Sequence, residues 1–531
     1  MLRRLCLLIF LLLGLAVLVT AAPATAKTVP GSPPFRVVIL DHMAGWQLRQ
    51  FARHGAVGLL VPGAGPTTNR RQALAQLVRG RQENAQLGGV PAGQPLLSAN
   101  LATGTPSHAR TIIVTLPPKS DLPVPNNKRY YVVVLGGGFH GLLVSKTTRI
   151  TGLVSIVDIA PTALGRRGSL TSTSSAHVVA YLKGLNAQIH ANNRLKLAVL
   201  IVLACFGLLL AFVRPRAALT AVPAALLASI GLGAAGVTNE VSIMTVLVVV
   251  TLVGGLWLAW ACRTDGALLL LFLGVVVLHL YLFAARPEWV AVTPLGPTQN
   301  SRFWGIGNQL ETLLLGPLLA GAAIAARKFG VLGFAAFGAL GLFMMTDNRF
   351  GSDGGGAIVL GVALAFLGAR TLRLGMRGFL MLLGVAAAVV LKIVSSNLDA
   401  TGPDHLRSAF GHGLSGVWAV AENRVPLSYL PAIHNWPLVL PLAIWFVASF
   451  AIAVVVSRRR PPRDFVLALG IAMVVSLLVN DSAMYELTGG VVVLGALMRF
   501  APAPAVPVTV RSLVRAVLPR ARTPVAARTR R

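Results

Sequence analysis

The stretch that decides the fold of this chain reads Asn300-Ser-Arg-Phe-Trp-Gly-Ile-Gly-Asn-Gln-Leu-Glu311 and runs without a break into the apolar segment Thr312–Ala326. An arginine, three amides and a carboxylate therefore stand at the mouth of a helix whose composition suits a membrane. The chain has only 16 acidic residues, and an ionisable group in a membrane helix is costly unless it has a function. We therefore expect the functional site to lie around this stretch.

The whole chain has the composition of a multi-pass membrane protein. Of its 531 residues, 55% are hydrophobic and 12% are charged, and the mean hydropathy is +0.73. The net charge of +31 comes mostly from arginines in short loops and in the C-terminal tail. This is the positive-inside pattern of membrane proteins, so nucleic-acid binding is not expected. The three cysteines form no disulfide or zinc spacing pattern.

The N-terminus has the features of an export signal. Arg3 and Arg4 precede the apolar core Leu5–Val19, and Ala24-Thr-Ala26 is a small-residue cleavage site. We predict a signal peptide at residues 1–26, with an uncleaved membrane anchor as the alternative. Either one places the following segment outside the cytoplasm.

Residues 27–193 are predicted to form an extracytoplasmic α/β domain. Alternating and continuous apolar patterns predict strands at Phe35–Asp41, Ala56–Val61, Thr111–Leu116, Tyr130–Leu135 and Leu153–Ile159. Helical spacing predicts helices at Trp46–His54 and Asn69–Arg81, the second capped by Thr67 or Thr68, and at Ser174–Asn193, which leads into the membrane.

Residues 194–500 are predicted to form an all-α membrane domain of about 11 transmembrane helices. The apolar runs are Leu197–Val213, Ala217–Ala235, Val241–Ala261, Ala267–Phe283, Phe303–Ala326, Val331–Met345, Ala357–Leu367, Phe379–Val394, Trp436–Val456, Phe465–Val479 and Leu487–Leu497. Arginines occupy every second loop, which keeps residues 27–193 outside and the basic tail 501–531 in the cytoplasm. We expect a multi-pass protein of a bacterial plasma membrane.

Three sequence segments in the predicted extracytoplasmic domain resemble segments of the alkaline phosphatase superfamily. Val37-Val-Ile-Leu-Asp41 resembles that family's first strand, which ends in a metal-binding aspartate. Gly65-Pro-Thr-Thr68 resembles the turn that presents the Ser/Thr nucleophile, and Leu153–Thr162 resembles the late Asp-Ile-Ala-Pro-Thr strand. The resemblance implies a phosphatase-like α/β fold in which the remnants of the catalytic site are Asp41, Thr67, Thr68 and Asp158.

The chain departs from that family's pattern in ways that argue against hydrolysis. The Asp-His-Gly motif expected before the late strand is absent, and His140 stands there as a lone imidazole. Two metal ions need more carboxylates than Asp41 and Asp121, the only aspartates of the domain before Asp158. We therefore interpret the domain as shortened and degenerate, and an enzymatic activity is not expected.

The layout of the whole chain resembles a family of bacterial envelope proteins in which an exported domain of this kind precedes a helical array. Arg302–Glu311 and Asn480-Asp-Ser482 carry this second resemblance. It implies a multi-pass membrane architecture and no particular activity.

Polar residues converge on the predicted outer ends of the helices. Asn308 and Glu311 are three residues apart and share a helix face. The run Ala357–Leu367 reaches only about 17 Å, so Gly351–Gly356 is expected to re-enter the membrane and offer backbone N–H groups to an anion. Trp304 is expected to lie at the lipid interface. The predicted substrate-binding residues are Arg302, Asn308, Glu311, Asp347, Asp353, Asn480 and Asp481.

These observations favour a transporter-like protein, or one that handles lipids or envelope precursors, with an outward-facing polar site. The alternatives are a non-catalytic envelope scaffold or sensor, and a residual metal-dependent phosphohydrolase in the exported domain. The expected partners are the lipid bilayer and an envelope lipid or envelope protein. No cofactor is predicted, and a divalent cation beside the carboxylates stays open as an alternative. The sequence has no Gly-x-x-x-x-Gly-Lys-Ser/Thr motif, so ATP-driven pumping is not expected.

Overall fold

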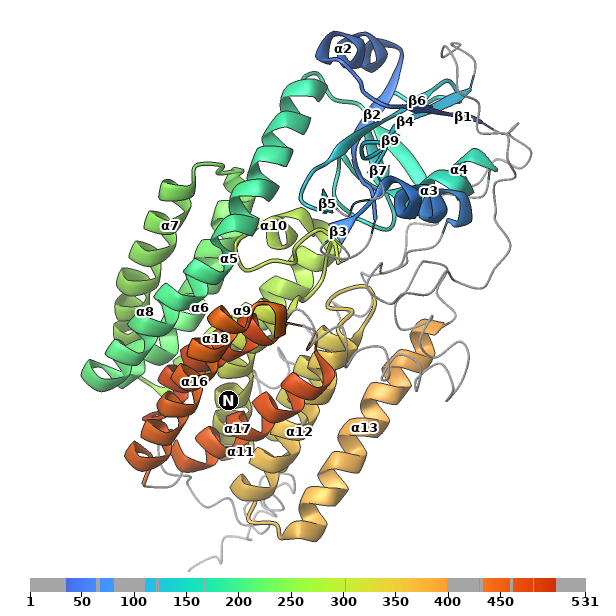
Figure 1. Cartoon of the computed structure of the whole chain (residues 1–531). Helices are drawn as coiled ribbons and strands as arrows, with labels where there is room; N and C mark the ends of the chain where they lie inside the picture. Colours follow the sequence, from blue (N-terminus) through green and yellow to red (C-terminus); the bar gives the residue numbers. More distant parts are fainter. Residues whose placement is uncertain are drawn as a thin grey trace, which may run out of the picture.

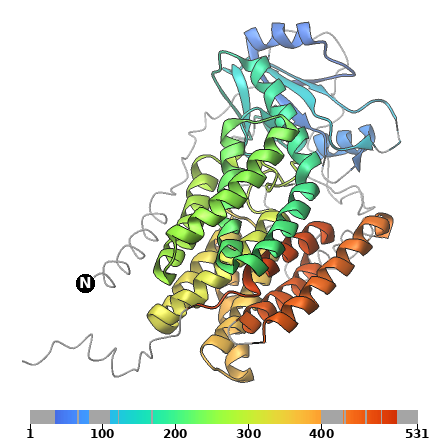
Figure 2. The ribbon, with the colours of Figure 1, turned by 90° about the vertical axis from the view of Figure 1, so that its left-hand side faces the viewer.

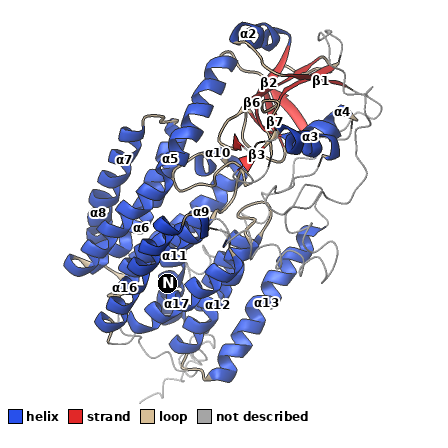
Figure 3. Ribbon diagram, in the orientation of Figure 1, coloured by secondary structure: helices blue, strands red, loops and turns tan. Residues whose placement is uncertain are grey.

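The computed structural model describes residues 35–63, 67–80, 110–120, 122, 124–165, 169–300, 302–398, 429, 433–458, 462–480 and 482–502. The predicted signal segment 1–26, Asp121, Asp481 and nearly all of the basic tail lie outside these residues. An α/β region with a mixed sheet lies at one end of the molecule, and a mostly helical part makes up the remainder (Figure 1). All strands lie in that one region (Figure 3). The predicted order of an α/β part followed by a helical part is confirmed.

The sheet of the α/β region runs in the order β1-β4-β6-β2-β7-β9, and β8 pairs with β2. Its strands are β1 (Arg36–Leu40), β2 (Gly55–Val61), β4 (Thr111–Thr115), β6 (Tyr130–Leu135), β7 (Gly141–Ser145), β8 (Leu153–Ser155) and β9 (Leu170–Thr173). β1 is parallel to β4, and β2 is parallel to β7 and β8, whereas the remaining pairs are antiparallel. A separate two-stranded ribbon joins β3 (Thr67–Thr68) to β5 (Val124–Pro125).

Each face of the sheet has its own apolar core. Successive residues of β2 alternate between them, since Ala56 and Leu60 contribute to one core and Val57 and Leu59 to the other. The helices α3 (Arg70–Arg79) and α4 (Ile159–Ala163) cover the first face. The second face is covered by α2 (Gly45–His54), by the start of α5 (Val178–Val213) and by Phe303, which precedes a membrane helix.

The five predicted strands are all present, but two local predictions were wrong. Thr67 and Thr68 form β3 and do not cap α3. Asn69 is the cap, because its side chain accepts a 2.8 Å hydrogen bond from the Gln72 backbone while the Gln72 side chain bonds back to Asn69. The last predicted strand ends at Ser155, where the chain turns into the short helix Ile156–Asp158.

The helical part contains nine helices among the described residues that are long and apolar enough to cross a membrane. Its elements are α5, α6 (Pro215–Ala235), α7 (Glu240–Val249), η3 (Val250–Gly254), α8 (Gly255–Ala261), α9 (Asp265–Ala285), α10 (Glu288–Ala291), α11 (Asn308–Thr346), α12 (Gly354–Thr371), α13 (Met376–Leu398), α16 (Trp436–Val456), α17 (Pro462–Val479) and α18 (Ala483–Leu497). Large apolar side chains on α8, α13 and α16 are exposed, including Trp257, Leu380 and Ile444. Exposed apolar helix faces of this kind suit a lipid bilayer.

The long helix α11 is two helical segments joined at Gly330. Gly330 has φ 69° and ψ −152°, a backbone conformation outside the helical region that glycine adopts without steric cost. A straight helix of 39 residues would be about 58 Å long, roughly twice the thickness of a bilayer core. At this bend the chain reverses direction, and the two segments pack against each other, Gly321 next to Phe337 and Gly341 next to Leu318. The predicted apolar run Phe303–Ala326 precedes the bend, and the run Val331–Met345 follows it.

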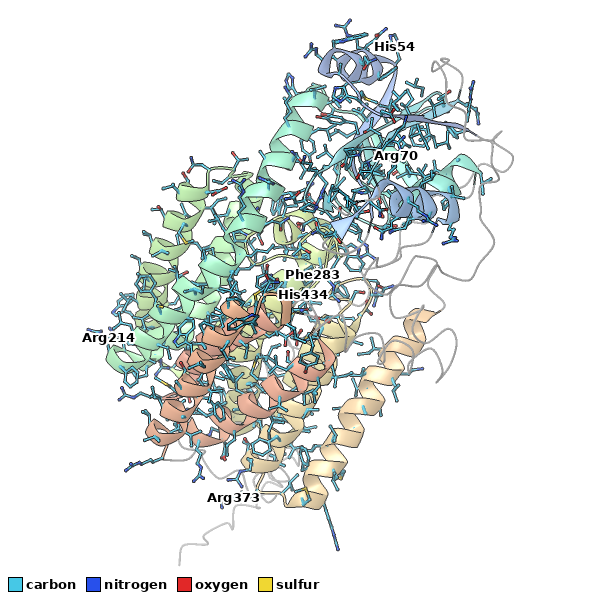
Figure 4. The ribbon with its side chains drawn as sticks, viewed as in Figure 1. His54, Arg70, Arg214, Phe283, Arg373 and His434 are labelled. Carbon is cyan, nitrogen blue, oxygen red and sulfur yellow. The ribbon has the colours of Figure 1, made fainter. Side chains whose placement is uncertain are left out.

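Arginines mark the end of the helical part that lies away from the sheet. The α/β region sits over one end, as the view in Figure 2 also shows. Arg214, between α5 and α6, and Arg373, between α12 and α13, lie at the other end (Figure 4). Arg327, beside the bend of α11, donates a 2.7 Å hydrogen bond to the carbonyl of Pro502, beyond the end of α18. The bend of α11 and the end of α18 therefore lie together.

Candidate functional site

The stretch Arg302–Gly307 is a loop, so the prediction that this helix begins at Phe303 was wrong. Gly305 has φ 81°, and the backbone N–H of Ile306 bonds to the carbonyl of Gly351 at 2.9 Å. The loop is thereby paired with the turn that precedes α12. Because α11 begins at Asn308, Glu311 lies in its first turn and not deep along a helix. Glu311 is nevertheless fully buried.

A path of hydrogen bonds leads from Glu311 to a second buried carboxylate. The Asn480 side-chain amide donates to Glu311 Oε2 at 2.9 Å and to Ser476 Oγ at 2.9 Å. The Ser476 hydroxyl donates in turn to Glu486 Oε2 at 2.5 Å. All four side chains are buried, and they come from α11, from α17 and the residue after it, and from α18. The path therefore ties three helices together at one end.

Asp353 and Arg302 form an ion pair beside this path. Asp353 caps the start of α12 by accepting a 3.3 Å bond from the Gly356 backbone, and its carboxylate lies 3.3 Å from the Arg302 guanidinium. Arg302 also donates to the backbone carbonyls of Ser352 and Ile306. The guanidinium thus fastens the loop before α11 to the turn before α12.

Gly356 brings the Glu311 and Asp353 carboxylates close together. A Cβ atom added to Gly356 would lie 2.9 Å from Asp353 Oδ2 and 2.9 Å from the Glu311 carboxyl carbon. These distances are shorter than those between Cβ atoms and their neighbours in real proteins. Both carboxylates therefore contact the same glycine. Glu311 Oε1 has no hydrogen-bond donor among the described residues, and Asp353 Oδ2 has only its ionic contact with Arg302. We call Arg302, Glu311, Asp353, Ser476, Asn480 and Glu486 the charge cluster.

The charge cluster holds more negative than positive charge. Three of its side chains are carboxylates and one is a guanidinium, and Asp353, Glu486 and Arg302 all act electrostatically on Glu311. If every carboxylate were ionised, the net charge would be −2 in a buried site, which is strongly unfavourable. Counted over these six residues, the charge is favourable only when protons or cationic groups offset the carboxylates. Among the described residues no group of three or more His, Cys, Asp or Glu is arranged to hold a metal ion.

Two predictions about α12 were wrong. The helix begins at Gly354 and has 18 residues, long enough at about 27 Å to approach the thickness of a bilayer core. Gly354–Gly356 form its first turn and do not re-enter as irregular backbone. The expected anion site at this helix start is taken by the chain's own Asp353 carboxylate, which already accepts from the Gly356 N–H.

The remaining predicted site residues do not belong to the charge cluster. Asp347 is buried in an ion pair of its own with Arg349, through two contacts of 3.0 Å. Asn308 begins α11, and its carbonyl accepts a hydrogen bond from Thr312 at 2.8 Å. Asp481 lies outside the described residues.

Sequence reasoning missed two members of the charge cluster, Ser476 and Glu486. Ser476 and Asn480 are four residues apart, which places them on one helix face. Glu486 precedes an apolar run in a chain poor in acidic residues. These two signals were available, but they identify no partner until the helices are packed.

The α/β region docks directly onto the loop that carries Arg302. The guanidinium of Arg149 lies 3.4 Å from the centre of the Trp304 ring and donates to the carbonyls of Asn348 and Arg349 at 3.1 Å each. The Trp304 indole N–H donates to the carbonyl of Thr147 at 3.1 Å. Trp304 therefore contacts the α/β region, and the prediction that its side chain contacts lipid was wrong.

The chain was compared with protein families, curated proteins and solved structures. No family model, no curated protein and no solved structure matches the chain.

The residues predicted from the phosphatase resemblance contact other residues of the α/β region. Asp41 lies 2.9 Å from Lys119 and 2.7 Å from Arg70, and the hydrogen bond from Lys119, with a smaller contribution from Arg70, holds the pKa of its carboxyl below the ordinary value. Thr68 is buried, and its hydroxyl donates to the Asn69 carbonyl at 3.4 Å. Thr67, half-buried, lies next to it in β3.

Asp158 holds together the turn that docks onto the membrane part. Its carboxylate accepts hydrogen bonds from the hydroxyls of Ser145 and Thr147, the second at 2.7 Å. Burial raises the pKa of Asp158 to about 7, and the two hydroxyl bonds oppose that rise. Asp158 thus stabilises the turn from which Thr147 and Arg149 reach Trp304.

Proposed function

We propose that this chain is a transporter-like membrane protein of the bacterial envelope that handles a charged envelope lipid or precursor at the charge cluster. The observation that carries the proposal is the buried path from Glu311 through Asn480 and Ser476 to Glu486, beside the Arg302–Asp353 pair. Intramembrane ionisable residues that contact one another suit substrate or proton pathways. The excess of carboxylates suits a site that takes up protons or cationic groups as it works.

We further propose a topology of eleven crossings with the α/β domain outside. In this topology α11 crosses twice about Gly330, and α18, at 15 residues, forms the last and shortest crossing. The arginines at the end opposite the sheet support this orientation through the positive-inside rule (Figure 4). Residues 1–26 then act as the export signal, residues 501–531 are cytoplasmic, and the charge cluster faces the outer leaflet.

The exported domain acts in this proposal as a fixed cover over the charge cluster. Arg149 and Thr147 hold Trp304, and Phe303 is buried in the core of the domain. Asp41, which the phosphatase resemblance would assign to a metal, is paired instead with an ammonium and a guanidinium. These pairs favour a structural or binding role for the phosphatase-like remnant over hydrolysis.

A scaffold or sensor is the second candidate function. It is favoured by the same docking, because a partner that binds the exported domain would act on Trp304 and therefore on the loop that carries Arg302. The two candidates differ in whether the charge cluster itself binds a ligand.

The test is a thermal-stability scan of the full-length protein in nanodiscs with divalent cations and phosphate-bearing envelope lipids. We expect a ligand to stabilise the wild type and not the variant Glu311→Gln/Asp353→Asn. The matched control is Asp464→Asn, because Asp464 pairs with Arg370 at 2.9 Å at the opposite end of α17. Equal stabilisation of wild type and double variant would exclude the charge cluster as the ligand site and favour the scaffold.

A further inference from the structure

A polar cavity of about 450 Å³ lies where the exported domain meets the helices, apart from the charge cluster. Its lining comes from three segments: the turn between β5 and β6 with the first residue of β6, the outer part of α5, and the chain around the start of α7. The lining residues that matter here are Lys128, Arg129, Asn186, His190 and Glu240. A volume of this size falls within the range of small-molecule sites in proteins.

Arg129 is the most deeply placed cation of this cavity. Its guanidinium donates to the Gln299 carbonyl at 3.0 Å, to the Asn300 side chain at 3.1 Å, and to two carbonyls of its own turn. All four acceptors are uncharged, and the Nε–H group is buried with no hydrogen-bond partner among the described residues. Burial lowers the pKa of Arg129 to about 10, so the side chain stays cationic at neutral pH. A buried guanidinium without a counter-charge favours binding of an anion.

The other charges of the cavity leave it basic. Lys128 is exposed at the rim, and His190 lies half-buried on α5. Glu240 is the one carboxylate of the lining, and it lies 3.4 Å from the Arg194 guanidinium, which offsets its charge. Lys128 offers an ammonium that can contact phosphate, and the buried positive charge of Arg129 lies beside it with its hydrogen bonds already made to the protein.

The level of the cavity relative to the membrane narrows the class of ligand. His190 precedes the apolar run that begins at Leu197 by seven residues, which corresponds to a height of roughly 10 Å along α5. In the proposed topology this height corresponds to the headgroups at the bilayer surface. A phosphate carried by a lipid headgroup and a phosphate carried by a water-soluble ester can both reach it.

We propose that this cavity binds the phosphate group of a phosphoester, with Lys128 as its cationic contact and the buried charge of Arg129 as a second source of attraction. The inference does not rest on the function proposed for the charge cluster. It has a structural consequence for that cluster, because Arg129 also holds Gln299 and Asn300, which directly precede the Arg302 loop. A ligand that engages Arg129 acts on the same loop.

The experiment measures binding to the full-length protein in nanodiscs of neutral phosphatidylcholine, with glycerol 1-phosphate as the soluble probe. We expect Lys128→Ala to weaken binding about tenfold or more, the effect of one charge-assisted hydrogen bond, and Arg129→Gln to weaken it through the loss of a nearby positive charge. The matched control Arg71→Gln, an exposed arginine of α3, should bind like the wild type. Glu240→Gln should bind about twofold more tightly or better, a gain that misfolding cannot produce.

A second arm replaces part of the phosphatidylcholine with phosphatidylglycerol and measures the thermal stability of the protein. Stabilisation that is seen only with phosphatidylglycerol and is lost in Lys128→Ala identifies the ligand as a lipid headgroup. Binding of glycerol 1-phosphate that the lipid does not reduce identifies a soluble ester. If neither probe binds, or if Arg129→Gln and Lys128→Ala bind both probes like the wild type, the proposal is overturned. Glu311→Gln should leave this binding unchanged, so its outcome is separate from that of the charge cluster.

Discussion

The Arg302–Asp353 pair gives the sharpest test of how the charge cluster is held. Asp353 is 3% exposed, so replacing Arg302 by methionine leaves a buried carboxylate without its cation. The substitution Asp353→Asn removes the charge but keeps an oxygen that accepts from the Gly356 N–H. The two substitutions together remove both charges and retain the cap of α12.

The structure sets the size of each effect. Breaking a buried pair by removing one partner costs about 3–5 kcal/mol, and the 27% exposure of the Arg302 side chain places Arg302→Met near the lower end of that range. Asp353→Asn alone should cost about 1 kcal/mol, because Arg302 keeps its bonds to the carbonyls of Ser352 and Ile306. The double variant should be more stable than Arg302→Met alone, with a coupling energy of about 2 kcal/mol.

The assay is reversible unfolding of the four proteins in mixed detergent micelles, which yields a complete double-mutant cycle. A favourable coupling of about 2 kcal/mol supports a buried and desolvated pair. Additive effects, with a coupling below about 0.5 kcal/mol, would refute the reasoning, because they are typical of a pair screened by water.

Three further predictions concern single residues. Gly356→Ala should destabilise the protein by about 1–2 kcal/mol through overpacking against the two carboxylates, whereas Gly274→Ala, which meets only open space on α9, should be neutral or stabilising in the same thermal unfolding assay. The pKa of Asp158 is about 7 when folded and ordinarily 3.8, so folding takes up a proton between these values. The stabilisation of the folded protein by protonated Asp158 is fully present below about pH 4 and is lost as the pH rises through 7. Asp158→Asn should flatten that dependence in unfolding curves recorded at about pH 5 and about pH 8, and an unchanged slope would contradict the burial argument. Arg149→Ala should speed hydrogen exchange in the Trp304 loop about tenfold by removing the cation–π contact and two hydrogen bonds, and unchanged exchange would show that the docking does not depend on this arginine.

The sequence predicted which segments form helices and strands more accurately than it predicted where each helix or strand begins and ends. Long apolar runs located the helices, because a span of about 20 apolar residues has few other uses. The start of α12 was misplaced because Gly354–Gly356 are weak helix formers, and only the cap by Asp353 and the packing against two carboxylates explain their helical conformation.

The site was predictable only where a polar residue stood out within an apolar run. Glu311 and Asn480 were found in this way, and the structure joins them by a 2.9 Å hydrogen bond. Ser476 was missed because a single serine in a membrane helix is unremarkable until its partner is known. The environment of Trp304 was predicted wrongly because a tryptophan side chain suits both a lipid interface and a protein interface. Its environment depends on Arg149, some 150 residues away in the chain.

The position of Phe303 has a consequence for the order in which this protein is made. The last strand of the sheet ends at Thr173, but one of the two cores of the sheet also contains Ala291, Val292 and Phe303. At ordinary rates of synthesis the ribosome needs on the order of ten seconds to proceed from Thr173 to Phe303. During that interval the helices from α5 to α9 are made, while one face of the sheet still lacks three residues of its core. The α/β region is therefore synthesised first, and its second core can be completed only after the helices that precede Phe303 have been made.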